Sequence, residues 1–116
     1  MNPTTAESVV KSQLAAYNAR DVEAFAATYH PEAVVTDLAS GRVVCSGRDE
    51  MRRVYGEMFA KAPGLRCEVR TRIVLGSRVI DEERVTGAPG GRELHAVAIY
   101  EVEAGLIRRV WLVREG

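Results

Sequence analysis

The chain has 116 residues, 47% of them hydrophobic, which is enough for one domain with one core. Its 16 basic residues balance its 16 acidic residues, so we expect no nucleic-acid partner and no membrane partner. No apolar run approaches the roughly 20 residues that span a bilayer, and no secretory signal pattern begins the chain. We therefore expect a cytoplasmic protein in which Cys45 and Cys67 are buried thiols.

Two helical patterns come first. Apolar residues spaced three or four apart predict a first helix that breaks at residues 18–21, and Thr4 and Glu7 have capping-box spacing at its start. Asp21 can cap the second helix, which Pro31 ends.

The rest of the chain is mostly strand-like. Residues 33–38 and 42–45 predict a strand pair around a turn at Ser40-Gly41, and a third helix then ends at Pro63-Gly64. Four further runs predict an antiparallel meander over residues 65–75, 78–86, 92–102 and 106–114.

The turn at Gly76-Ser77 predicts the register of the first hairpin. It pairs Arg72 with Asp81 and Arg70 with Glu83, so that opposite charges face each other across the strands. The opposite face is more apolar and carries Glu82 as a polar intruder, so we expect it to face the core.

The turn at Ala104-Gly105 predicts the register of the second hairpin. It pairs Ala98 with Trp111, and it places Arg109 and Trp111 on the face that points into the protein. The other face is also apolar, and a sheet that is apolar on both faces must be covered on both. We expect a homodimer through that outer face, which includes Val97, Ile99, Val110 and Leu112.

The order of elements, together with four segments, carries a resemblance to a known family. These segments are QLAAYNARDV (13–22), YHPEAVVTD (29–37), SGRDEM (46–51) and GLIRRVW (105–111). They resemble the nuclear transport factor 2-like superfamily, which includes SnoaL-like cyclases and ketosteroid isomerase. The resemblance covers nearly all of residues 1–116 and implies a single SnoaL-like domain. Its fold class is α+β, with a cone-shaped, curved antiparallel sheet wrapped around N-terminal helices.

The resemblance also implies a catalytic set. Ketosteroid isomerase uses an Asp base with a Tyr and a protonated Asp as donors. Aligned on Ala-Val-Val-Thr-Asp, the base falls on Asp37, whereas the donors fall on Gln13 and Ala98, so two of the three groups are absent. Tyr17 lies one helical turn from Gln13 and can assist it. The alternative is that Asp37 caps the turn that follows its strand.

A second set of residues is expected to contact a ligand in the pocket. These residues are Tyr55, Phe59, Glu82, Tyr100, Arg109 and Trp111. Structural roles remain open for several of them. Glu82 can form an ion pair with Arg84 or Arg109. Tyr55 and Trp111 can be part of the hydrophobic core instead. The two histidines, His30 and His95, lie on different elements, so we expect no metal site, and we expect no cofactor.

Three functions fit these observations. The first is a small enzyme that acts on an apolar carbonyl-type molecule by Asp-mediated proton transfer, as an isomerase, cyclase or lyase does. The second is a binder of small molecules that uses the same pocket without catalysis. The third is a dimeric interaction module, and fold alone does not choose among them.

Overall fold

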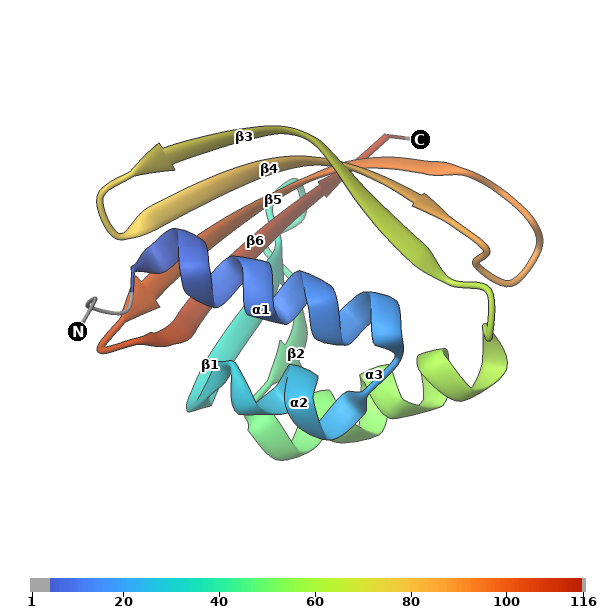
Figure 1. Ribbon diagram of the computed structural model, residues 1–116, viewed down its shortest axis with the longest axis horizontal. Helices are drawn as coiled ribbons and strands as arrows, with labels where there is room; N and C mark the ends of the chain where they lie inside the picture. Colours follow the sequence, from blue (N-terminus) through green and yellow to red (C-terminus); the bar gives the residue numbers. More distant parts are fainter. Residues whose placement is uncertain (1–4, 116) are drawn as a thin grey trace.

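A computed structural model describes residues 5–115 of the chain. Three helices lie on one side of a curved six-stranded sheet, whose long strands arch over the first helix (Figure 1). The helices are α1 (Ala6–Ala19), α2 (Val22–Ala27) and α3 (Arg48–Lys61). The strands are β1 (Tyr29–Asp37), β2 (Val43–Ser46), β3 (Arg66–Leu75), β4 (Arg78–Thr86), β5 (Leu94–Glu103) and β6 (Leu106–Arg114). The α+β fold class predicted from the sequence is confirmed.

Side-chain caps fix the starts of the first two helices. The side chain of Thr5 accepts a hydrogen bond from the Ser8 amide, and the Ser8 hydroxyl accepts one from the Thr5 amide. The capping box therefore lies one residue after the predicted one, whose Thr4 is outside the described residues. Asp21 caps α2 as predicted, by accepting from the amide of Ala24.

The second helix ends earlier than the sequence predicts. Its C-cap is Thr28, and Pro31 lies within β1. This is possible because β1 interrupts its pairing between Tyr29 and Val34, so the missing amide hydrogen of Pro31 removes no ladder hydrogen bond. The sheet order is β2-β1-β6-β5-β4-β3, with β1 and β6 parallel and every other neighbouring pair antiparallel.

A register shift next to the last turn overturns the predicted faces of β6. Val102 pairs with Ile107, but beyond the shift at Glu101 the register changes by one residue. Ala98 therefore lies opposite Leu112, and Trp111 lies opposite Ile99. A one-residue slip exchanges the two faces of a strand. As a result, Val110 is buried on the inner face and Trp111 lies on the outer face, the reverse of the prediction.

The predicted inner face of β4 is also wrong. Asp81 and Glu83 point toward the helices and are only 1% and 9% exposed, whereas Glu82 points outward. The predicted pairing of Arg72 with Asp81 is correct, but a shift between Val69 and Thr71 moves Glu83 opposite Val69. The charge of Asp81 is tolerated inside because Arg72 binds both of its carboxylate oxygens, at 2.7 and 2.9 Å.

Aromatic side chains dominate the core beneath the sheet. Phe25 is fully buried and packs against Tyr55 with ring centroids 4.6 Å apart. Phe59 packs edge-on against Phe25 and Tyr17. These contacts join α2 and α3 to α1 in one core. Within residues 5–115, no helix is both long enough and apolar enough to cross a membrane.

Candidate functional site

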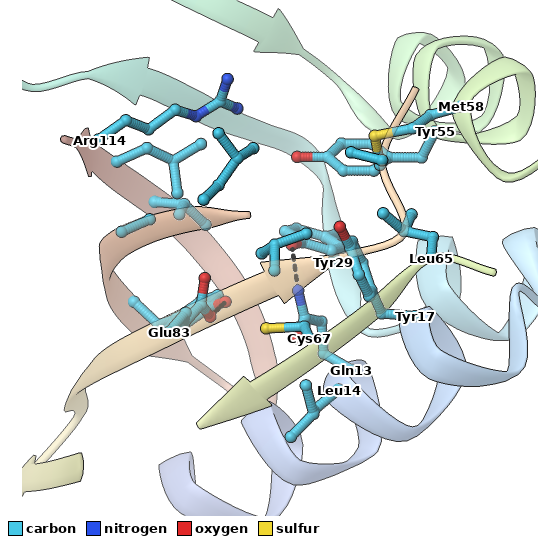
Figure 2. A pocket seen from close by; sticks show the side chains of 17 residues that line it. Gln13, Leu14, Tyr17, Tyr29, Tyr55, Met58, Leu65, Cys67, Glu83 and Arg114 are labelled. Carbon is cyan, nitrogen blue, oxygen red and sulfur yellow. Dashed lines mark hydrogen bonds between the residues drawn. The ribbon is translucent and has the colours of Figure 1, made fainter. Parts of the chain in front are cut away.

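A cavity of about 150 Å³ lies between the inner face of the sheet and helices α1 and α3 (Figure 2). Its wall is largely apolar and comes from side chains of α1, α3 and every strand except β2. A cavity of this size in an apolar core accommodates a molecule such as benzene. The polar groups that project from this wall into the cavity are a buried carboxyl group, four tyrosines and one glutamine. These groups can recognise a ligand.

Glu83 is the ionisable acid of the cavity. Its position on β4 turns the side chain inward, where the hydroxyl of Tyr100 donates to its Oε2 at 3.3 Å. Burial raises the pKa of Glu83 to about 7, and the negative charge of Asp81 adds to this effect, while hydrogen bonds from Tyr100 and Cys67 oppose it. At neutral pH this carboxyl group can therefore both accept and donate a proton.

Two tyrosine hydroxyls are free to bind a ligand. Tyr17 of α1 and Tyr55 of α3 both line the cavity, and neither hydroxyl has a hydrogen-bond partner among residues 5–115. Burial raises the pKa of Tyr55 to about 12 and that of Tyr17 still higher, so both remain protonated donors at neutral pH. Two such donors in an apolar cavity suit a carbonyl oxygen or an oxyanion.

Gln13 lies in the cavity wall as predicted, but its side chain already has a partner. Its amide nitrogen donates to the hydroxyl of Tyr29 at 3.1 Å, and both side chains are buried (Figure 2). Gln13 therefore orients Tyr29. Tyr29 starts β1, where the sequence had predicted the end of a helix.

Asp37 does not line the cavity, and the prediction that it points into the barrel is wrong. It ends β1, and its Oδ2 accepts from the amide and the hydroxyl of Ser40, at 3.0 and 2.6 Å. These hydrogen bonds hold the pKa of Asp37 below its usual value. The carboxylate thus caps the β1–β2 turn, which was the structural alternative, because this pairing satisfies it at the surface.

The residues predicted to contact a ligand divide into two groups. Tyr55 and Tyr100 line the cavity, and Phe59 packs against Tyr17 and Tyr55. The structure places the other three, Glu82, Arg109 and Trp111, on the outer face.

The outer-face residues have partners there. Glu82 binds Thr71 and His95, at 2.9 and 2.8 Å, so it pairs with neither Arg84 nor Arg109. Arg109 binds Glu101 at 2.7 Å. The outer position predicted for His95 is confirmed.

Glu83 and Arg114 are functional candidates that the sequence reasoning missed. Arg114, the last residue of β6, also lines the cavity, but it is exposed to solvent. Both residues lie on strand faces that the sequence analysis assigned to the outside: Glu83 alternates inward with Val79, Asp81 and Val85 on β4, and Arg114 lies on the inner face of β6. No group of three His, Cys, Asp or Glu side chains within residues 5–115 is arranged to bind a metal ion.

Comparisons with known proteins agree with this architecture. The model of the SnoaL-like domain family matches residues 10–110. Among curated proteins, none matches the chain. A cystatin-fold protein from Novosphingobium aromaticivorans is 27% identical, with 97% of this chain and 100% of that chain covered and a TM-score of 0.89.

Two more distant structures share the fold. A candidate ketosteroid isomerase from Kribbella flavida is 20% identical, with 96% of this chain and 78% of that chain covered and a TM-score of 0.80. A protein from Catenulispora acidiphila with a ketosteroid isomerase-like fold, in complex with trimethylamine, is 16% identical, with 90% of this chain and 82% of that chain covered and a TM-score of 0.74. Since the family model matches most of its length, the chain belongs to the SnoaL-like domain family and has the NTF2-like fold.

Proposed function

We propose that the cavity binds a compact, mostly apolar carbonyl compound and that Glu83 transfers a proton to and from it. The observation that carries the proposal is a buried carboxyl group with a pKa of about 7, in the wall of an apolar cavity that also presents free tyrosine hydroxyls. A general base is most effective when its pKa lies near the working pH. Glu83 therefore takes the role that the sequence analysis gave to Asp37.

The size of the cavity restricts the substrate. About 150 Å³ is room for one ring or a short branched chain, and a fused four-ring steroid is too large to be enclosed. The proposed substrate class is therefore a ketone of about ten non-hydrogen atoms or fewer, with its apolar part against the side chains of β5 and β6.

The proposed step uses groups that are already in place. The Glu83 carboxylate takes a proton from the carbon next to the carbonyl, and the electrons of that C–H bond form the enolate. The hydroxyls of Tyr17 and Tyr55 donate hydrogen bonds to the oxygen as it becomes negative. Protonated Glu83 then returns the proton to the same carbon, or, when the substrate is a β,γ-unsaturated ketone, to its γ carbon, which isomerises the substrate without a cofactor.

Exchange of ketone α-protons with solvent deuterium tests this function. Cyclohexanone or phenylacetone is incubated with the protein in D₂O, and the exchange is followed by proton NMR. Glu83→Gln should lower the catalysed rate by about 10²–10⁴, because it keeps the shape and removes the base. Glu82→Gln, one residue away on the outer face, is the matched control and should keep the rate.

The result also separates enzyme from binder. If the compounds bind but Glu83→Gln does not change their exchange, the chain is a binder of small molecules and the catalytic proposal fails. If neither compound binds, the cavity does not serve ligands of this class. A dimeric interaction module then becomes the better explanation.

We also propose that a second copy of the chain covers the outer face of the sheet. Val97, Ile99, Trp111 and Val113 are partly exposed there, and Trp111 lies directly opposite Ile99. These residues replace the predicted set, of which Val110 and Leu112 face inward. An apolar strip flanked by charged side chains suits the core and rim of an interface.

A further inference from the structure

Arg114 brings a positive charge to a cavity whose other lining side chains are apolar, neutral polar or, in the case of Glu83, acidic. It lies on the inner face of β6, in line with Val110 and Leu112, and it is exposed where those two are partly or fully buried. Figure 2 shows Arg114 and Glu83 on clearly separate parts of the lining. The cavity therefore has a buried acidic end and an accessible basic end.

The guanidinium group of Arg114 has no partner within residues 5–115, either in an ion pair or in a side-chain hydrogen bond. Several other arginines of the sheet are paired, including Arg72 with Asp81 and Arg109 with Glu101. The neighbouring Glu115 is engaged by His95 at 2.9 Å. The positive charge of Arg114 is thus available to a ligand.

The same charge acts on the two free hydroxyls. Burial raises the pKa values of Tyr17 and Tyr55, and the positive charge of Arg114 opposes this rise in both. Tyr17 of α1, Tyr55 of α3 and Arg114 of β6 line the same cavity.

We infer that the ligand of this cavity carries a carboxylate, which binds Arg114 at the accessible end while its apolar body fills the cavity. This inference rests on the proposed function and narrows the substrate class to small ketones that also carry a carboxylate and have a ring or a branched chain. A ring of benzene size fits the enclosed volume, and a carboxylate attached to it can remain near Arg114 and solvent. Such a position avoids burying the anion.

Benzoate and benzamide are the probes that test this inference, because they have the same shape and differ in charge. Titration calorimetry is done at about pH 6, below the pKa of Glu83, so that this carboxyl group is mostly uncharged. The native chain should bind benzoate about threefold to tenfold more tightly than benzamide, which is a moderate gain because the guanidinium is solvent-exposed. Raising the salt concentration to about 0.5 M should reduce the preference.

Arg114→Gln should abolish the preference for benzoate while leaving benzamide affinity unchanged. Arg109→Gln, on the outer face of the same strand, is the matched control and should keep it. Equal binding of the two probes by the native chain would overturn the inference but leave the proposed function intact. A preference for benzoate that survives in Arg114→Gln would also overturn it. Failure of both probes to bind would also overturn the inference, and binding of cyclohexanone or phenylacetone then decides separately whether the proposed function stands.

Discussion

Replacing Glu83 with Gln should change how stability depends on pH. Glu83 has a pKa of about 7 in the folded chain against an ordinary 4.5, so it binds a proton more tightly when folded. Its contribution to stability is fully present below about pH 4.5 and is lost as the pH rises to about 7. The difference between these pKa values corresponds to about 3 kcal/mol of unfolding free energy. The Glu83→Gln variant has no ionisable group at this position, so it should not lose this unfolding free energy as the pH rises.

Urea unfolding at a series of pH values measures this effect. The unfolding free energy of Glu83→Gln minus that of the native chain should rise by about 3 kcal/mol between pH 4 and pH 8. With a urea m-value of roughly 1–3 kcal/mol per molar, the midpoints should diverge by at least about 1 M. Other carboxyl groups titrate in both proteins and cancel in the difference.

Glu82→Gln provides a control of opposite sign. His95 and Thr71 hold the pKa of Glu82 below its usual value, so Glu82 contributes stability at neutral pH that is lost as the pH falls through this lowered pKa. Relative to the native chain, the Glu82→Gln variant should therefore lose more unfolding free energy at neutral pH than in acid. Parallel pH curves for Glu83→Gln and the native chain would refute the reasoning, because they would mean that burial does not perturb Glu83.

Three further substitutions test other parts of the account. Arg72→Met leaves Asp81 buried without its partner and should cost about 3–5 kcal/mol in urea unfolding, and a cost below 1 kcal/mol would show that the pair is not buried in solution. Asp37→Asn should leave catalysed ketone exchange unchanged, because Asp37 only caps a turn; loss of exchange would restore it as the base. Ile99→Glu should convert a dimer into a monomer by light scattering, and a native chain that is already monomeric would contradict the proposed interface.

The sequence predicts the elements of this fold well because the signals for them are local. Helical periodicity predicts α1 and α3, and alternation between glycine-containing turns predicts β3 to β6 to within two residues at either end. Pro31 is the exception. It was read as a helix stop, and it lies in β1 because that strand has no partner at this point.

The faces of the strands could not be predicted in the same way. Each face depends on a single register shift, one at Glu101 and one between Val69 and Thr71, and nothing local in the sequence signals either shift. The raised pKa of Glu83 depends on which face of β4 the residue occupies and on its burial, so the sequence could not predict it either. Gln13, Tyr17, Tyr55 and Tyr100 were correctly predicted to line the cavity. The structure adds Glu83 and Arg114 to them.

Titration of the Glu83 carboxyl carbon by NMR is the most direct test of the central claim. Carbon-13-labelled glutamate makes every side-chain carboxyl signal visible, and the signal missing from Glu83→Gln identifies Glu83. The account predicts a titration midpoint near 7, which a ligand in the cavity shifts. A midpoint near 4.5 that no compact ketone or carboxylate moves would contradict the claim that this residue is the acid–base group of the site.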